Sequence, residues 1–468
     1  MRIYNTLTRQ IEDFIPINDD LVTIYTCGPT VYDFAHVGHW FNYVRMDTLI
    51  RTLKANNYKT KWVMNITDVG HLTSDADEGE DKIQKKALKE HKNAYQVAQF
   101  YTDHFLKDMH QLNILSPDYL VKATEHIKDQ IDLILKLKEK GYTYKIDGDG
   151  IYYDTSKFKK YADFGRLDLD EQTAGARVQF NPKKKNISDF ALWKFSPNDS
   201  KRDMEWDSPF GKGFPGWHIE CSAMSMKYLG DTMDFHTGGI DHIPVHHTNE
   251  IAQSEAVSGQ SLAHYWMHSN HVMIDNQKIS KSLGNGITLD ELINKGYTAM
   301  TLRLHILESH YQSQSKFSFQ SLSAAQKRLQ ELYQMAALRY QLSEIKDQLS
   351  FNFKEAAINI KDLLSNNLNT PEVLAFLSSV STQTIVVGIS NLELNDFIYF
   401  LEKIDAYLGL DLMSISDITL EQKNLIQDRS KARSNKDWEK SDIIRDKLLK
   451  QGIQLNDLND KSYWYRII

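Results

Sequence analysis

The run from Val22 to His39 constrains the fold of this chain more than any other stretch. Its first five residues are β-branched or aromatic and a turn at Gly28-Pro29 follows them, so residues 22–26 are expected to form a buried strand. A helix is expected after the turn, and a second strand follows over Thr60–Asp68. This order of strand, helix and strand favours a parallel sheet with a right-handed crossover, which predicts an α/β fold.

A ligand is expected at the end of the first strand. In open α/β sheets, ligands bind beyond the carboxyl ends of the strands, and the N–H groups of a helix N-terminus attract anions. Cys27 lies at that strand end, and His36 and His39 flank Gly38 at the start of the helix. Glycine lets a flat ring approach the backbone, and imidazoles can hydrogen-bond phosphate oxygens. Taken alone, an inert core thiol and inactive surface histidines are the more common explanation.

Composition indicates a protein of several domains without a membrane segment. The 468 residues suggest two to four domains of about 100 to 200 residues each. No window approaches the roughly 18 apolar residues of a membrane span, and the N-terminus lacks an apolar signal core, so we expect a cytoplasmic protein. The net charge of −7 argues against nucleic-acid binding over the whole surface. Residues 429–450 carry eight basic and four acidic side chains, a pattern more typical of a solvated helix face than of a binding site.

The two cysteines of the chain allow three interpretations: inert core thiols, a transient disulfide or two metal ligands. Cys221 is expected in the first turn of a helix, where the helix dipole favours a thiolate. His246 and Glu250 are four residues apart and share one face if their segment is helical. Two thiolates, an imidazole and a carboxylate make a tetrahedral zinc set, which we favour over a helix with satisfied polar residues. The expected zinc ligands are Cys27, Cys221, His246 and Glu250.

A polar loop with two lysines follows, reading Lys278-Ile279-Ser280-Lys281-Ser282. It precedes Thr288–Glu291, which has the capping-box pattern of a helix start. The loop could be an ordinary connection. Together with the two histidines after the first strand, its ammonium groups would supply the mobile positive charge that a departing pyrophosphate needs.

Two of these elements resemble the signature motifs of class I aminoacyl-tRNA synthetases. They are His36-Val37-Gly38-His39 and Lys278-Ile279-Ser280-Lys281-Ser282, in that order. Three further stretches are similar to the cysteinyl-tRNA synthetase family, namely Cys27-Gly28, Gly216–Met224 and His246–Ser254. The resemblance covers nearly the full chain. It implies an enzyme that activates L-cysteine with ATP and transfers it to the 3′ end of tRNA(Cys).

The same resemblance implies a Rossmann-like parallel sheet split by an insertion, then an α-helical bundle and a small C-terminal anticodon-binding domain. The expected order is the first half of the catalytic domain, the insertion, the second half with the zinc ligands, a stem-contact region with the lysine loop, the bundle and the anticodon-binding domain. The boundaries are 1–115, 116–205, 206–265, 266–318, 319–405 and 406–468. The insertion looks too short for the large editing domain of related synthetases.

The resemblance also implies roles for single residues. Catalysis falls to His36, His39, Lys278 and Lys281, which with Gly38 also bind ATP. The amino-acid pocket includes Thr67 and Trp217. The residues at anticodon-reading positions are Arg433, Trp438, Asp442 and Asp457. In this family, four protein ligands hold a zinc ion that binds the thiol of the substrate, and these ligands match the four residues named above. Zinc prefers a soft thiolate to a hydroxyl, which distinguishes cysteine from serine.

The implied cofactors are one Zn²⁺ per chain and Mg²⁺ with ATP. The implied partners are tRNA(Cys), ATP and L-cysteine, with a monomeric chain and no membrane. The sequence departs from the family pattern at Ile279, Thr237 and Thr248, none of which removes a zinc ligand. The acidic loop 74–81 lengthens the segment after Thr67-Asp68, so the placement of Asp68 depends on the structure.

Three other functions are compatible with parts of the sequence. A ligase that activates cysteine but passes it to an amino-sugar, as in mycothiol synthesis, would not need the basic C-terminal helix. A zinc hydrolase usually carries His-Glu-x-x-His, which is missing from the sequence. A tRNA-binding relative without catalytic activity would not need both signature motifs intact.

Overall fold

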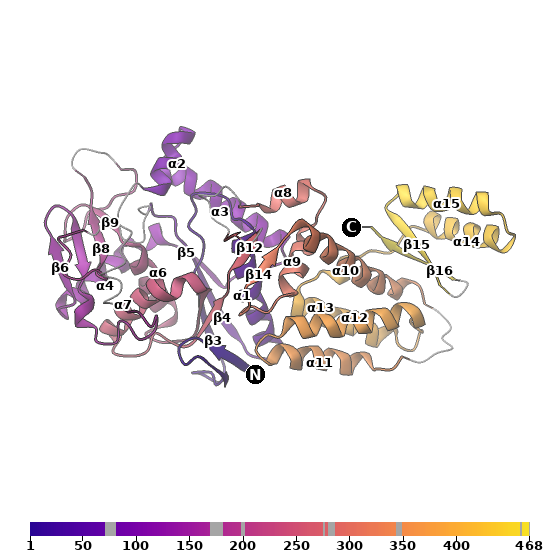
Figure 1. Ribbon diagram of the computed structural model, residues 1–468, viewed down its shortest axis with the longest axis horizontal. Coiled ribbons are helices and arrows are strands. Elements are labelled where there is room, and N and C mark those ends of the chain that lie inside the picture. The colour runs from indigo at the N-terminus through magenta and orange to yellow at the C-terminus, as the bar shows by residue number, and fades with distance from the viewer. Residues whose placement is uncertain are drawn as a thin grey trace.

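The chain forms an elongated molecule in which four regions follow one another (Figure 1). This computed structural model describes residues 1–70, 81–168, 181–197, 202–274, 277–278, 286–342, 349–458 and 461–467. A small antiparallel sheet lies at one end and the parallel sheet lies next to it. The helical bundle and a small C-terminal unit occupy the other end (Figure 1). Within the described ranges, no helix has both the length and the apolar composition needed to cross a membrane.

The central sheet has five parallel strands in the order β11-β10-β3-β4-β5, which confirms the predicted α/β class. The strands are β3 (Val22–Thr26), β4 (Thr60–Ile66), β5 (Tyr119–Lys122), β10 (Met233–Gly239) and β11 (Ala263–Ser269). The first three strands run outward from β3, and the chain then returns to the other side of β3 for β10 and β11. This reversal of direction lies between β3 and β10, and ligands of open α/β sheets bind at such a point.

The strand β5 corrects the predicted boundary at residue 116. Tyr119–Lys122 pairs with Val63–Ile66 of β4 and therefore belongs to the central sheet, not to the insertion. The strand has four residues, and only Val121 among them is buried. A four-residue edge strand with a single buried side chain has too little apolar alternation to be recognised from sequence, so the prediction missed it.

Helices cover both faces of the central sheet because the side chains of each strand alternate between them. Val22 and Ile24 pack into the core formed with α1 (Val37–Ala55). Tyr25 and Cys27 point to the opposite face, into the core formed with α6 (Trp217–Leu229). The other helices of this region are α2 (Lys82–Glu90), α3 (Ala94–Gln111), α4 (Ile127–Glu139) and α7 (Thr248–Ser258).

The insertion forms a four-stranded antiparallel sheet in the order β6-β7-β8-β9. Its strands are β6 (Thr143–Ile146), β7 (Gly150–Tyr153), β8 (Phe190–Phe195) and β9 (Gly213–Pro215). β6 and β7 form an antiparallel hairpin in which Thr143 pairs with Tyr153 and Ile146 with Gly150. Because β9 pairs with β8, the insertion sheet continues past the predicted boundary at residue 205 and ends directly before α6.

The remaining elements connect the sheet to the bundle and the C-terminus. Near the sheet lie β1 (Arg2–Asn5), β2 (Gln10–Asp13), β12 (Val272–Ile274), β13 (Gln277–Lys278), α8 (Leu289–Asn294), α9 (Ala299–Leu307) and β14 (Ser315–Phe317). The bundle contains α10 (Phe319–Ala337), α11 (Phe353–Ser365), α12 (Thr370–Val387) and α13 (Leu394–Leu408). The C-terminal unit consists of α14 (Leu420–Ser434), α15 (Trp438–Lys450), β15 (Ile453–Leu458) and β16 (Lys461–Arg466).

A buried charge network fixes α1 against the helices that follow the lysine loop. The Asp47 carboxylate on α1 contacts the Arg303 guanidinium of α9 and lies 2.7 Å from Arg51 Nε. Arg303 Nε also donates to the Leu408 carbonyl of α13 at 2.6 Å. Because each charged group is paired inside the core, the network holds α1, which begins at the first signature motif, in a fixed position relative to the bundle.

Candidate active site and metal centre

The carboxyl ends of β3, β4 and β10 border a cleft with a cavity volume of about 390 Å³. It lies where the strand order reverses, which is the position expected for a ligand in this type of sheet. Its walls contain the predicted residues Cys27, His36, Gly38, His39, Thr67, Trp217, Cys221 and His246. Residues far apart in the sequence, from both sides of the insertion, therefore share one cavity.

Gly28 sets the geometry at the end of β3. A Cβ atom at this position would lie 1.6 Å from the Asn65 carbonyl oxygen, so only glycine fits between the two strand ends. The Gly28 N–H donates to Asn65 Oδ1 at 2.7 Å, and Asn65 Nδ2 donates to Thr67 Oγ1 at 3.0 Å. This chain of contacts fixes Cys27 and Thr67 side by side at the base of the cleft.

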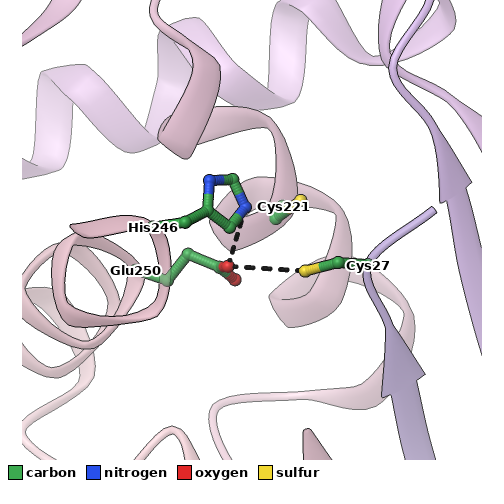
Figure 2. A group of neighbouring side chains, drawn as sticks. All are labelled: Cys27, Cys221, His246 and Glu250. Atoms are coloured by element: carbon green, nitrogen blue, oxygen red, sulfur yellow. Dashed lines mark hydrogen bonds and ion pairs between the residues drawn. The ribbon is translucent and has the colours of Figure 1, made fainter. Parts of the chain in front are cut away.

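The structure brings the four predicted metal ligands together (Figure 2). Cys27 follows β3 and Cys221 lies on α6. His246 lies in the π-helical turn Ile243–His247, and Glu250 lies on α7, which follows that turn. Their ligand atoms lie within 4.8 Å of one another. Cys27 Sγ is 3.7 Å and His246 Nε2 is 3.1 Å from Glu250 Oε1. Two free thiols, an imidazole and a carboxylate at these distances form a possible metal-binding site with the donor chemistry that zinc prefers.

Cys221 lies further along its helix than the sequence predicts. Cys221 is the fifth residue of α6, which begins at Trp217, so it lies beyond the first helical turn that the sequence analysis assumed. A hydrogen bond from Cys27 lowers the pKa of the Cys221 thiol, and His246 adds to this effect against the opposing effect of burial. Neighbouring side chains, and not the helix dipole, therefore favour its thiolate.

The buried charges of this cluster are coupled. Burial, together with Cys221 and Glu250, raises the pKa of the Cys27 thiol well above its usual value. Burial alone would lower the pKa of His246, but Glu250 and Cys221 beside it raise that pKa to about 10. Burial would raise the pKa of Glu250, yet His236 and His246 hold it below its usual range. In the absence of a metal, the cluster therefore retains protons that an incoming cation would displace.

Buried histidines surround the cluster, and the sequence analysis did not single them out. His236 Nε2 lies 2.8 Å from Glu250 Oε2, so it orients the carboxylate. His247 Nε2 lies 3.3 Å from Cys27 Sγ, and its other nitrogen is 2.8 Å from His268 Nε2. His247 directly follows a predicted ligand, which was an available signal. His236 and His268 lie on neighbouring strands, so only the strand pairing brings them into the site.

The two signature histidines stack on each other at the start of α1, with ring centroids 3.8 Å apart. The His36 backbone N–H donates to His39 Nδ1 at 3.0 Å, so Nε2 carries the proton of a neutral His39 imidazole. Both rings line the cleft, as does Gly38 between them. The motif therefore presents hydrogen-bond donors to the cavity, as phosphate binding requires.

The lysine loop is described only at its edges. The backbone of Lys278 in β13 pairs with that of Met273 in β12. Lys281 lies outside the described residues, as do residues 74–80 of the acidic loop. On the far side of the loop, the Val37 N–H donates to the Ile287 carbonyl at 2.8 Å. Ile287, which follows the loop, therefore lies next to the first signature motif. Thr288 caps α8 with the predicted capping box.

The insertion contributes a further lysine to the cleft. Lys194 of β8 lines the cavity, and its ammonium group contacts the Asp149 carboxylate and lies 3.0 Å from the Tyr152 hydroxyl.

Asp68, which follows Thr67, accepts hydrogen bonds from the Thr124 N–H at 2.9 Å and the Thr124 hydroxyl at 2.6 Å. These contacts attach the end of β4 to the segment after β5.

The four predicted anticodon-reading residues all lie in the C-terminal unit. The Arg433 guanidinium is 5.8 Å from the centroid of the exposed Trp438 ring, and Arg433 Nη1 is 2.9 Å from Asp457 Oδ2. Asp442 instead pairs with Arg445 at 3.2 Å. Arg429, which was not among the predicted residues, is buried and donates to both Asp457 oxygens at 2.8 Å. Hydrogen bonds from Arg429 lead the effects that lower the pKa of Asp457 to about 2.

Solved structures with this fold include two class I enzymes. Methionyl-tRNA synthetase of Mycobacterium tuberculosis, bound by methionyl-adenylate, aligns with a TM-score of 0.59 at 13% identity over 84% of this chain and 93% of that chain. The LeuRS–tRNA–LeuAMS ternary complex from Agrobacterium radiobacter K84 aligns with a TM-score of 0.59 at 11% identity over 86% of this chain and 85% of that one. At these identities the likeness shows the fold.

Sequence comparison identifies the family. Residues 13–327 match the family described as tRNA synthetases class I (C) catalytic domain. Cysteine–tRNA ligase of Treponema denticola is 39% identical over 100% of both chains. Cysteine–tRNA ligase 1 of Burkholderia lata is 42% identical over 98% of this chain and 95% of that chain. The chain therefore belongs to the cysteine–tRNA ligase family of class I tRNA synthetases.

Proposed function

We propose that this protein activates L-cysteine with ATP and transfers it to the 3′ end of tRNA(Cys), with zinc in the four-residue cluster selecting the substrate thiol. One observation carries the proposal. Cys27, Cys221 and His246 line the same cleft as the stacked rings of His36 and His39, so a thiol-recognising centre and phosphate-binding donors face one cavity.

The first step needs no general base, because the substrate carboxylate is already ionised at neutral pH. A bond forms between a carboxylate oxygen and the α-phosphorus of ATP, the bond from that phosphorus to the bridging oxygen breaks, and pyrophosphate leaves. The Nε2 proton of His39 can be donated to a phosphate oxygen because Nδ1 already accepts from His36 N. His36, Lys278 and Lys281 complete the proposed charge stabilisation.

Selection of the amino acid rests on Cys27, Cys221, His246 and Glu250. When bound there, zinc would supply a soft Lewis acid that prefers a thiolate to a hydroxyl. His236 orients Glu250, and Gly28 fixes Cys27, so the donor set is held in place by its surroundings. Thr67 and Trp217 line the cleft beside this set, where they would bound the rest of the amino acid.

In the second step, the 3′-terminal ribose hydroxyl of tRNA attacks the activated carbonyl carbon. An ester bond forms, the bond to the phosphate oxygen breaks, AMP leaves and the hydroxyl proton passes to solvent. Arg433 and Trp438 offer a guanidinium and an exposed indole, groups that pair with and stack on unstacked RNA bases. Asp457 is bound by Arg429 and Arg433, which favours a role in holding Arg433 in position. Asp442 is an exposed acid on the same unit.

The proposal includes Mg²⁺ as the companion ion of ATP and a cytoplasmic, monomeric enzyme. Both thiols of the chain are free in the structure, which suits a reducing compartment. An amino-sugar acceptor in place of tRNA is the alternative, and the basic C-terminal unit argues against it.

The test is aminoacylation of total tRNA with labelled cysteine and labelled serine, with and without a zinc chelator. We expect cysteine to be attached to tRNA, serine to be rejected and chelation to abolish charging. Equal charging of both amino acids would contradict zinc selection. Cysteine-dependent exchange between ATP and pyrophosphate without any charging of tRNA would favour the amino-sugar acceptor.

A further inference from the structure

A second group of metal-binding side chains lies outside the cleft, between α3 and α8. His104 and Asp108 are one turn apart on α3, and Asp290 is the second residue of α8. His104 Nε2 lies 2.9 Å from Asp290 Oδ2, and His104 Nδ1 lies 3.4 Å from Asp108 Oδ2. One donor atom of each residue lies within 4.8 Å of the others. The function proposed above uses none of these three residues.

Asp108 is the feature of this group that requires explanation. Its side chain is fully buried, and neither carboxylate oxygen has a hydrogen-bond partner among the described residues. Burial raises its pKa to about 6, so at neutral pH the group is mostly ionised without a donor. Asp47 is equally buried, but against that burial Arg303 and Arg51 lower its pKa. Asp108 faces the His104 imidazole at 3.4 Å, and His104 lowers the Asp108 pKa too little to offset burial, so a bound cation would relieve an unfavourable buried group.

The net charge of the side chains around this group favours binding of a cation. Lys107, a half-exposed side chain, lies 3.1 Å from Asp290 Oδ1 and so is directed at the outer carboxylate. With a neutral imidazole, two carboxylates and one ammonium give the group a net charge of −1. The Asp290 side chain is 44% exposed and can therefore rotate inward without disturbing the core.

We propose that His104, Asp108 and Asp290 form a second metal site that binds a divalent cation of the zinc type. Ligand atoms about 2.0 to 2.2 Å from zinc lie roughly 3.3 Å apart, so donor atoms that lie within 4.8 Å of one another need only side-chain rotations to reach an ion. An imidazole nitrogen with two carboxylate oxygens suits Zn²⁺, Co²⁺ or Mn²⁺, whereas Mg²⁺ prefers oxygen ligands alone. Three protein ligands leave further positions for water.

The location gives this site a consequence for the fold around the cleft. The Phe34 ring packs against His104, with centroids 4.6 Å apart, and lies two residues before His36. On the other side, Ile287 accepts the hydrogen bond from Val37 N–H. A cation would therefore join α3 to the segment that leaves the lysine loop, beside the first signature motif.

The test measures zinc binding to the full chain after the proposed zinc centre of Cys27, Cys221, His246 and Glu250 has been loaded with Zn²⁺. After desalting, Zn²⁺ is titrated against a chromophoric chelator, and Mg²⁺ is titrated as the comparison ion. We expect the wild-type chain to bind one additional Zn²⁺ and to bind Mg²⁺ at least about tenfold more weakly. Asp290→Asn, which alters a partly exposed side chain, should weaken the additional binding about 10- to 100-fold. Asp103→Asn removes an exposed carboxylate from the same helix and should leave it unchanged.

Lys107→Gln provides an independent test with the opposite sign. It removes a positive charge and the group directed at Asp290, so the additional Zn²⁺ should bind several-fold more tightly. A purely structural role for the three residues would not produce this gain. The rise in melting temperature that added Zn²⁺ produces should be smaller for Asp290→Asn and larger for Lys107→Gln than for the wild type. If the wild-type chain binds no additional ion, or if Asp290→Asn and Asp103→Asn bind it equally well, the proposal is wrong.

Discussion

Cys27 Sγ lies 3.7 Å from Glu250 Oε1, although 223 positions separate the two residues in the chain. The contact exists because β10 pairs alongside β3, and α7 follows β10 and packs over the strand end that carries Cys27. The candidate zinc centre is therefore built across the line where the two halves of the catalytic region meet. Any change that alters the pairing of these strands should affect metal binding and catalysis together.

Cys221→Ser should weaken the proposed metal centre while leaving the rest of the cleft intact. A serine hydroxyl is a poorer zinc ligand than a thiolate, so zinc affinity and cysteine-dependent ATP–pyrophosphate exchange should both fall at least about 100-fold. Zinc content by elemental analysis and the exchange rate are the measurements. Ser225→Ala, a buried change on the same helix, is the control and should retain zinc. Full exchange activity in a zinc-free Cys221→Ser chain would contradict the proposed role of the metal.

Arg433→Gln should impair tRNA recognition without affecting amino-acid activation. The variant loses the guanidinium above Trp438 and the ion pair with Asp457, both of which lie in the C-terminal unit, far from the central sheet (Figure 1). We expect kcat/KM for tRNA(Cys) charging to fall by about 10- to 100-fold, as for loss of one or two base contacts. The ATP–pyrophosphate exchange rate should stay at the wild-type value. Lys447→Gln, which replaces a half-exposed lysine on α15 that pairs with Glu421, is the matched control.

Asp68→Asn should change how stability depends on pH. Burial dominates the pKa of Asp68 and raises it to about 6, against hydrogen bonds from Thr124 that lower it. Because this pKa is above the unfolded value, the stability that Asp68 contributes is present below about pH 4 and is lost as the pH rises through about 6. Asparagine does not titrate, so the variant should lack this loss.

The expected difference is up to roughly 3 kcal/mol in the free energy of unfolding between about pH 4 and pH 7. Thermal or denaturant unfolding of wild type and Asp68→Asn at both pH values measures it. Asp132→Asn, which replaces a half-exposed acid on α4, should behave as the wild type does. Parallel pH profiles for wild type and Asp68→Asn would show that the Asp68 carboxyl is not held in an unfavourable environment.

Gly28→Ala should disrupt the base of the cleft. The new Cβ would lie 1.6 Å from the Asn65 carbonyl oxygen, a backbone atom of a central strand that cannot move aside cheaply. We expect a loss of several kcal/mol in stability, with about 3 kcal/mol as a lower estimate for overpacking of this kind. Gly239→Ala is the control, since a Cβ there meets no atom within 4 Å. Equal melting temperatures for the two variants would contradict the tight contact between β3 and β4.

The sequence by itself determined the α/β class, the central strand Val22–Thr26 and the family. These features depend on local patterns: a run of β-branched and aromatic residues, a glycine-proline turn and short motifs at fixed spacing. The sequence also named four residues that the structure brings within 4.8 Å of one another. The sequence could single out these four residues because zinc chemistry restricts the ligand types to a few, and the chain has only two cysteines.

Tertiary structure alone decided the features that depend on contacts between distant segments. It added β5 to the central sheet, because a four-residue edge strand is defined by its pairing with β4 and not by its own pattern. It surrounded the metal centre with His236 and His268 through the pairing of β10 with β11. It also placed a carboxylate oxygen of the buried Asp108 within 4.8 Å of donor atoms of His104 and Asp290. Local sequence encodes the period of a strand or helix, whereas burial and partners are set only when separate elements pack together.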